Sequence, residues 1–416
     1  MKTAELRVKL DKNINKLYRQ LDKQGINNYD KIKVTLNSIN KLTDGEEPSN
    51  DTKKLVKSLI VGPFSDKLAK LDVVGNLYGK AGSGDGHGLG IVLTPAMVTD
   101  LMCKLINVNS NNHVLDLCCG AGAFPVAAIN HGAKHILALE YQPEMAELAK
   151  ENIKLSGGNP DSVHVTDSFK YDKFDDFKVD RLLLNPPYSF DQKGQPFLKL
   201  GLDHLQPGGL AAIIIMSKAG NGGAAEINKE ILKDNTLLGS IEMPEKLFYP
   251  AASVSTCIYV LQHGRPHDFD NDKVKFIKFS DDGFSRTKRT FNIQGSNDPD
   301  QLYNHILSLY RDGKDDNDGK YDDEYIEDTI TNSGEDWNFD HHHEIDLRAK
   351  PEDFYKTIKD YQDWLYSQWK EDVDRAMLAK IIGEGDGSFV NYNQMTITWP
   401  EYVKEVMGYD EYKQLD

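Results

Sequence analysis

The stretch HVLDLCCGAGAF, residues 113–124, joins an apolar strand-like run to a glycine-rich turn and the start of a helical segment. Asp116 ends the apolar run, and Gly120 and Gly122 follow in the turn. Glycines here let a ligand approach the backbone at the carboxyl end of the first strand of an α/β sheet. The dinucleotide fingerprint requires a third glycine where this chain has Pro125, which disfavours a nicotinamide or flavin cofactor. The stretch therefore predicts an α/β fold with a ligand site at this turn, although a glycine turn alone is a weak signal.

Short runs rich in leucine or β-branched residues alternate with helix-length segments from Thr94 onward. This alternation predicts a doubly wound parallel sheet that is covered by helices on both faces. We expect seven strands, at residues 113–118, 135–140, 163–166, 180–184, 210–216, 237–242 and 255–262.

The segments that flank this α/β region differ from it in character. Leucine and isoleucine recur at three- and four-residue steps over residues 4–24, which indicates an amphipathic helix, and the next segments repeat the pattern. A glycine-dense stretch, residues 79–90, indicates a loop between parts. Near the other end, a charged loop precedes an aromatic-rich amphipathic segment, residues 352–378. We expect a helical N-terminal domain (1–80), a central α/β domain (81–285) and a C-terminal extension with an acidic loop and helices (286–416).

The charge of the chain is strongly uneven. The net charge of −16 argues against a protein that binds nucleic acid by bulk electrostatics alone. Residues 312–346 hold fourteen acidic and two basic residues, a net of −12, whereas residues 1–60 hold thirteen basic and eight acidic residues, a net of +5. The rest of the chain can therefore still present a positive face.

We expect no signal peptide, because residues 1–20 have no apolar stretch of that kind, and no membrane-spanning segment, because the longest apolar run, LAAIIIM from Leu210, is too short. We therefore expect a cytoplasmic protein without a membrane partner. The four cysteines include no CxxC pair and are interpreted as reduced apolar residues. Three adjacent histidines, residues 341–343, are interpreted as solvated or locally hydrogen-bonded, and no metal site is predicted.

Acidic residues follow the second and third predicted strands as well as the first. Glu140 ends the run KHILALE, where a carboxylate can accept both hydroxyls of a ribose; the alternative is an ordinary position before the helix that begins near Pro143. Asp167 ends SVHVTD, where an acceptor for an adenine amino group would lie. Together with Asp116 and the glycine turn, these residues indicate a pocket for an adenosine-bearing ligand without a phosphate requirement.

The order of these motifs resembles the amino-methyltransferases that use S-adenosylmethionine. The motifs are TP (Thr94 and Pro95), DLCCGAG, Glu140, Asp167 and NPPY. More narrowly, GLGIVLTPAMVTDLM, NPPY, PGGLAAIIIMS and LFYPAASVSTCIYVL are similar to the modification subunits of type I restriction-modification systems and related N6-adenine DNA methyltransferases. The resemblance covers about residues 80–285. The chain departs from it in DLCC, where these families more often have proline after the aspartate.

The resemblance implies a class I methyltransferase fold, S-adenosylmethionine as the cofactor and methylation of adenine N6 in DNA. It implies a cofactor pocket built from Leu93, Thr94, Pro95, Asp116, Gly120, Ala121, Gly122, Glu140, Asp167 and Asn185. It also implies a catalytic motif, Asn185, Pro186, Pro187 and Tyr188, with a second aromatic that stacks on the target base. Phe248 or Tyr249 in LFYPAAS fits that second role, and core packing is the alternative for Phe248.

The NPPY motif suits the chemistry of an exocyclic amine, whose lone pair is delocalised into the ring. The side-chain carbonyl of Asn185 and the backbone carbonyl of Pro186 are two acceptors in a stiff turn. Two acceptors on one NH2 group favour rehybridisation of the nitrogen towards an electrophilic methyl group. Tyr188 is able to stack on a base that has been flipped out of the duplex. The alternative is that the two prolines only terminate a strand, with Asn185 capping a turn.

Other functions remain open at this stage: methylation of RNA or of a protein glutamine, and a methyltransferase-like assembly scaffold without activity. The last 130 or so residues are a poor surface for reading base edges. Their aromatics, Tyr355, Tyr361, Trp364, Tyr366 and Trp369, suit docking between helices. The resemblance implies a hetero-oligomer on DNA with a specificity subunit and, in some systems, a restriction subunit.

Overall fold

The computed structural model describes residues 3–26, 28–43, 46, 56, 93–249, 252–287, 291–295, 297–345, 347 and 351–384. Contacts divide the chain into two compact units, residues 1–344 and 345–416. The predicted helix in TKKLVKSLIVGPF, apart from Val56, and the glycine-dense stretch at 79–90 lie outside the described residues. The division at residues 80 and 285 stays a prediction.

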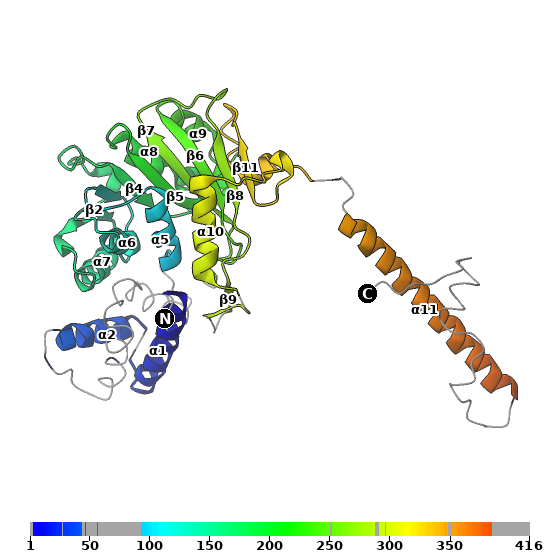
Figure 1. Ribbon diagram of the computed structural model, residues 1–416. Coiled ribbons are helices and arrows are strands. Elements are labelled where there is room, and N and C mark those ends of the chain that lie inside the picture. Colours follow the sequence, from blue (N-terminus) through cyan, green and yellow to red (C-terminus); the bar gives the residue numbers. More distant parts are fainter. Residues whose placement is uncertain are drawn as a thin grey trace. The chain divides into compact units, whose positions relative to one another are not determined.

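The first unit is an α/β structure (Figure 1). Its helices are α1 (Thr3–Lys23), α2 (Asn28–Thr43), α5 (Ala96–Leu105), α6 (Ala123–Asn130), α7 (Pro143–Leu155), α8 (Gln195–Asp203), α9 (Ala225–Ile231) and α10 (Pro299–Asp312). Its strands are β1 (His113–Asp116), β2 (His135–Glu140), β3 (Val163–Val165), β4 (Arg181–Leu184), β5 (Leu210–Met216), β6 (Asn235–Glu242), β7 (Thr256–His263), β8 (Val274–Lys278), β9 (Phe284–Arg286), β10 (Phe291–Ile293) and β11 (Tyr325–Asp328).

All seven predicted strands are present, and the prediction of a doubly wound methyltransferase-type sheet is confirmed. The strand count is larger than predicted, because the described sheet has nine strands in the order β11-β8-β6-β7-β5-β4-β1-β2-β3. Strands β8 and β11 extend it beyond β6. The sheet is also mixed, since β7 runs antiparallel to β5 and β6, and β11 runs antiparallel to β8.

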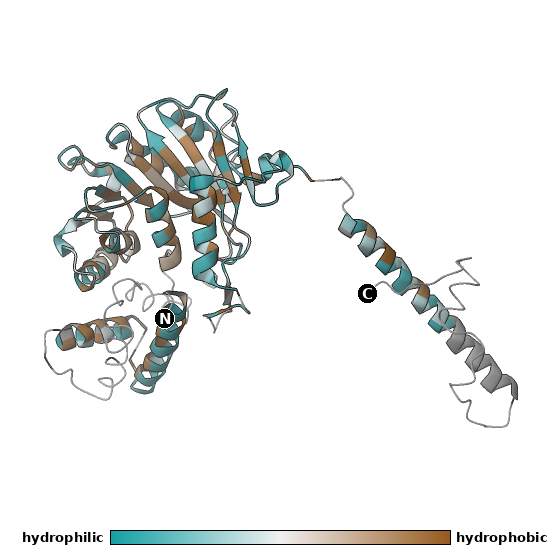
Figure 2. Cartoon of the chain, in the orientation of Figure 1, coloured by the Kyte–Doolittle hydropathy of each residue, from teal (hydrophilic) through white to brown (hydrophobic). Residues whose placement is uncertain are grey.

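Alternation along the strands explains why helices cover both faces. In β5, Ala212 and Ile214 belong to the core that includes α5, α6, α7 and α10, whereas Ala211, Ile213 and Ile215 belong to the core that includes α8 and α9. Successive side chains of a strand point to opposite faces, so an uninterrupted apolar run fits a sheet that is buried on both sides. Figure 2 shows the strands of the sheet largely in the apolar colour.

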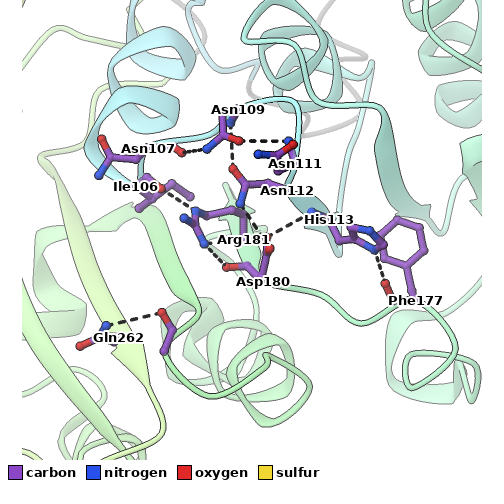
Figure 3. Close-up of polar contacts among 11 residues, drawn as sticks. Ile106, Asn107, Asn109, Asn111, Asn112, His113, Phe177, Asp180, Arg181 and Gln262 are labelled. Carbon is purple, nitrogen blue, oxygen red and sulfur yellow. Dashed lines mark hydrogen bonds and ion pairs between the residues drawn. The ribbon is translucent and has the colours of Figure 1, made fainter.

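Hydrogen bonds at the amino ends of β1 and β4 tie these neighbouring strands together (Figure 3). The carboxylate of Asp180 accepts from the backbone N–H of His113 at 3.1 Å and from the side-chain amide of Asn112 at 3.2 Å. The Nε of Arg181 donates to the carbonyl of Ile106 at 2.6 Å. These contacts hold the start of β4 against β1 and the end of α5.

The predicted amphipathic helix at residues 4–24 is confirmed as α1. Its apolar stripe is buried to 1% exposure or less and consists of Leu6, Leu10, Ile14, Leu17 and Leu21. The same apolar cluster contains Ala121 from the glycine turn and Met145 and Leu148 from α7. The N-terminal helices therefore pack against the segment that carries the glycine turn.

The acidic segment is more ordered than the expected charged loop. Its residues Tyr325–Asp328 form β11, and Trp337 and Phe339 are fully buried. Between these two aromatics, Asn338 donates to the carbonyl of Ser217 at 2.8 Å and accepts from the hydroxyl of Tyr259 at 2.5 Å. Apolar residues spaced among the acids thus anchor the segment on the sheet.

The three adjacent histidines are locally hydrogen-bonded, as predicted. Their ring nitrogens lie within 3.1 Å of oxygens of Asn221, Asp328 and Asp323, for His341, His342 and His343 respectively. Among the described residues, no group of His, Cys, Asp and Glu is arranged to hold a metal ion.

The described residues of the second unit include one long helix, α11 (Pro351–Glu384). The predicted helical segment is a single helix, whereas its amphipathic character stays a prediction, because Leu365 alone is buried among its described side chains. Its exposed large side chains include Phe354, Tyr355, Ile358, Tyr361, Trp364 and Tyr366. Within the described part of the chain, no helix combines the length and the hydropathy needed to cross a membrane.

Candidate functional site

The residues predicted for the site lie at the carboxyl ends of four neighbouring strands. The sheet order places β4, β1, β2 and β3 side by side and parallel. Asp116 ends β1 and Glu140 ends β2, while Asp167 follows β3 and Asn185 follows β4. Because the chain moves from β1 to β2 on one side and reaches β4 on the other, the strand order reverses between β1 and β4. Open α/β sheets bind ligands at such a switch point.

The glycine turn is held in a fixed shape between β1 and α7. Gly122 has φ 85°, and a Cβ at this position would lie 3.2 Å from the backbone Cα of Ala149, so only glycine fits. Gly120 donates its backbone N–H to Glu140 at 2.8 Å, and a Cβ on Gly120 would meet no atom within 4 Å. The carbonyl of Ala121 accepts from the side chain of Asn152 at 2.9 Å. The turn is therefore anchored, with open space beside Gly120.

Glu140 is almost buried and organises the turn from the end of β2. Its two carboxylate oxygens accept the backbone N–H groups of Gly120 and Gln142, both at 2.8 Å. Each oxygen has a second lone pair, so a ribose hydroxyl remains a possible further donor. The structure thus adds a positioning role to the ribose contact that the sequence predicts.

Asp116 has a buried carboxyl group in which one oxygen lacks a hydrogen-bond partner among the described residues. It is 1% exposed, and its Oδ1 accepts from the backbone N–H of Cys118 at 3.1 Å. Its Oδ2 has no hydrogen-bond partner among the described residues. Burial, with a smaller contribution from the negative charge of Glu140, raises the pKa of Asp116 to about 8. A buried acceptor without a partner is costly, and a ligand that donates a hydrogen bond or a positive charge relieves this cost.

We expect the free energy of unfolding of Asp116→Asn, measured relative to wild type, to rise with pH in the ligand-free chain. The pKa of Asp116 is about 8 in the folded state, whereas an unfolded aspartate has a pKa of about 3.9. Its stabilising contribution is therefore fully present only below about pH 3.9 and is lost as the pH rises to about 8. Denaturant unfolding of both proteins at several pH values measures the difference. A difference that stays constant across this range contradicts the raised pKa.

Asp167 lies in a half-exposed turn beside an aromatic cluster that the sequence reading missed. Its Oδ1 accepts from the backbone N–H of Phe169 at 3.1 Å. The exposed rings of Phe169 and Phe190 stack with centroids 5.6 Å apart and an interplanar angle of 3°. Phe197 supports both rings edge-on, at 4.8 and 5.0 Å. The sequence signal that could have revealed this cluster is the spacing of its aromatics: Phe169 stands two positions after Asp167, and Phe190 stands two positions after Tyr188.

The NPPY turn is rigid on the side of the prolines. Pro186 is buried, and Pro187 is exposed. A Cβ on Gly194 would lie 2.8 Å from Cγ of Pro186, so the chain after the motif passes directly over this ring. At the head of the turn, the side-chain NH2 of Asn185 donates to the hydroxyl oxygen of Thr94 at 2.8 Å.

The two aromatics predicted to hold the target base are in contact with each other. Tyr188 and Phe248 meet edge to face, with ring centroids 6.2 Å apart. The hydroxyl of Tyr188 is buried without a hydrogen-bond partner among the described residues, and burial raises its pKa. Phe248 is 5% exposed and belongs to the core, so the core-packing interpretation describes this conformation. Its role in stacking stays a prediction, as does that of the half-exposed Tyr249.

Two further predicted pocket residues come from the segment before α5. Pro95 stands directly before the first residue of α5, and Leu93 packs on the cluster formed by the N-terminal helices. With Thr94 between them, the structure brings this segment to the end of β4 through the contact with Asn185.

The fold is that of the S-adenosylmethionine-dependent methyltransferases, and polar residues stand at the ends of four neighbouring strands. A solved structure of the type I restriction-modification system methyltransferase subunit from Streptococcus thermophilus aligns with a TM-score of 0.54 at 19% identity, over 70% of this chain and 67% of that one. The model of the N-6 DNA Methylase family matches residues 71–196 and 191–346, and the chain belongs to this family.

Two curated relatives are similar to this chain in sequence. One is the type II restriction enzyme and methyltransferase RM.BcgI of Heyndrickxia coagulans, 28% identical over 360 residues, which are 79% of this chain and 54% of the relative. Another is the type I restriction enzyme MjaIX methylase subunit of Methanocaldococcus jannaschii, 26% identical over 55% of this chain and 48% of the relative. The chain thus spans about half the length of these relatives.

Proposed function

We propose that this chain is a site-specific DNA methyltransferase that transfers a methyl group from S-adenosylmethionine to N6 of a flipped-out adenine, as the modification subunit of a restriction-modification system. The observation that carries the proposal is the position of Asn185. It stands at the end of β4, the strand beside β1 and its glycine turn. Membership of the N-6 DNA methylase family supports the same target atom.

The donor and acceptor pattern of the pocket fits S-adenosylmethionine. This molecule has hydrogen-bond donors on its amino group, ribose and adenine, and it has no phosphate. Glu140 and Asp167 are acceptors at two strand ends, and the buried oxygen of Asp116 at a third would become an acceptor when a donor or positive charge of the ligand lowers the raised pKa of this carboxyl group. The exposed faces of Phe169 and Phe190 suit contact with a purine ring. When bound, the cofactor supplies the electrophilic methyl group.

The residues of the NPPY turn act on the target amine. Asn185 and the carbonyl of Pro186 accept the two amine hydrogens, which localises the nitrogen lone pair towards the methyl group. The stiff Pro186–Pro187 segment keeps these acceptors in place, so little reorganisation is needed during transfer. The new N–C bond would form as the bond between the methyl carbon and the cofactor sulfur breaks, with that electron pair remaining on sulfur. The nitrogen would then carry a positive charge and would lose one of its two hydrogens to water as a proton. Tyr188 and Phe248 hold the base in this geometry after it has left the duplex.

The reaction product tests the proposal directly. We expect N6-methyladenine in DNA that has been incubated with the chain, its partner subunits and S-adenosylmethionine, because the Asn185 amide is suited to an adenine amine. Digestion to nucleosides followed by mass spectrometry measures the product. Methylated RNA, a methylated glutamine side chain or N4-methylcytosine as the sole product would contradict the proposal, and failure to bind S-adenosylmethionine would favour an inactive scaffold.

We further propose that the chain depends on a specificity subunit to choose its DNA site, within a hetero-oligomer that in some systems includes a restriction subunit. The exposed aromatics of α11 support a docking role, and the net charge of −16 disfavours tight DNA binding by the chain alone. Mapping the methylated positions after incubation with the isolated chain tests this. Robust methylation of one defined motif by the isolated chain contradicts the requirement for a partner.

A further inference from the structure

Thr94 contacts Asn185 although 91 positions separate them in the sequence. The side-chain Nδ2 of Asn185 donates to Oγ1 of Thr94 at 2.8 Å. Thr94 is 4% exposed and Asn185 is half-buried, so this hydrogen bond is partly shielded from water. Partial exclusion of water strengthens the bond and its hold on the amide.

In this contact the planar amide of Asn185 has its NH2 group turned towards Thr94. An amide has a donating NH2 on one arm and an accepting oxygen on the other. With the NH2 directed at Thr94, the oxygen occupies the opposite arm. Rotation by 180° would reverse the roles in this hydrogen bond, because the hydroxyl of Thr94 would then donate to the amide oxygen, and it would present NH2 hydrogens in the other direction. A target amine that must donate its hydrogens is accepted only in the first orientation.

We propose that Thr94 is a positioning residue that holds the Asn185 amide in place for the target amine. This inference rests on the proposed function, and it replaces direct cofactor binding as the main role of Thr94.

The position of Thr94 is itself well defined. Pro95, with φ −61°, follows it and immediately precedes α5. Helix α5 is packed in the core by seven buried residues, Met97, Val98, Thr99, Leu101, Met102, Cys103 and Leu105. On the other side of the contact, Asn185 follows the buried strand residues of β4. Both partners therefore project from rigid elements, so the bond is preorganised before substrate arrives.

Thr94→Val tests the proposal, because valine keeps the shape of threonine and removes the acceptor. We expect kcat for DNA methylation to fall about 10- to 100-fold, by analogy with the cost of misplacing a reacting group. The dissociation constant for S-adenosylmethionine, measured by calorimetry, should change less than about twofold, and Thr94→Ser, which retains the hydroxyl, should restore kcat. If Thr94→Val instead weakens cofactor binding tenfold at unchanged kcat, or if Thr94→Ser fails to restore kcat, the positioning role is wrong.

A matched control is available in the same helix segment. Thr99 is 3% exposed, and its hydroxyl donates to the carbonyl of Ala96 at 3.1 Å, without contact to the site. Thr99→Val removes a buried hydroxyl in the same way and should leave kcat within about twofold. A loss as large as that of Thr94→Val would assign both effects to disturbance of α5 and would overturn the proposal.

A second measurement is independent of activity and separates this inference from the proposed function. In asparagine-labelled protein, the NH2 resonances of Asn185, assigned by their absence in Asn185→Asp, should exchange slowly with solvent. They should exchange faster in Thr94→Val and slowly again in Thr94→Ser. Identical exchange in wild type and Thr94→Val would overturn the positioning role. If the slow exchange is observed but no DNA is methylated, the proposed function fails while the contact is confirmed.

Discussion

Asn185→Ala is expected to lower the rate of methyl transfer by about a hundred- to a thousand-fold, the usual cost of removing one preorganised polar group from an active site. Affinity for S-adenosylmethionine should change only a few-fold. The reason is positional: the amide stands at the end of β4, whereas the acidic acceptors of the pocket stand at the ends of β1, β2 and β3. Single-turnover methylation and calorimetry with the cofactor measure the two effects separately.

Glu140→Ala is the matched control, because we expect it to weaken cofactor affinity more than it lowers the rate of methyl transfer. Its carboxylate holds the backbone N–H groups of Gly120 and Gln142, and its loss should loosen the glycine turn and chiefly weaken cofactor affinity. Unfolding midpoints of both variants check that the fold persists. Wild-type activity in Asn185→Ala would refute the catalytic role of the amide.

Trp337→Ala is expected to lower the free energy of unfolding by about 3–5 kcal/mol, as for other large buried aromatics. Trp337 is 0% exposed, packs edge-on against Tyr259 at 5.4 Å and donates its backbone N–H to Gly220 at 3.1 Å. Removal of the indole would leave a cavity beneath the acidic segment. Denaturant unfolding measures the loss.

Two other substitutions make this result specific. Trp364 on α11 is 53% exposed, so Trp364→Ala should cost about 0.5 kcal/mol or less. Trp337→Phe should cost less than Trp337→Ala, because the indole N–H of Trp337 has no acceptor among the described residues and its removal breaks no hydrogen bond. Equal costs for Trp337→Ala and Trp364→Ala would show that the acidic segment contributes nothing to the core.

The strands of the central sheet were predictable because their signals are local. A run such as LAAIIIM in β5 is short, apolar and β-branched, and a two-sided sheet is the structure that buries it completely. The turn after β1 was also predictable from local residues, because the positive φ at Gly122 favours glycine at this position. The leucine spacing of α1 likewise identified its buried face.

Strand β11 was missed because its signal is not local. Its four residues, Tyr325–Asp328, include two acids and follow a highly charged segment. They become a strand by pairing antiparallel with Val274–Ile277 of β8, far earlier in the chain. β-propensity depends on such neighbours more than on the segment itself.

The sequence by itself determined the class of fold, the polar residues at the strand ends and the NPPY turn, because hydrophobic periodicity and turn chemistry act over a few neighbouring residues. Only the tertiary structure decided which of these groups meet. It engaged both oxygens of Glu140 with backbone N–H groups, stacked Phe169 on Phe190, and turned the amide of Asn185 towards Thr94. These contacts join distant segments, and their geometry follows from strand order and packing, which no local pattern in the sequence records.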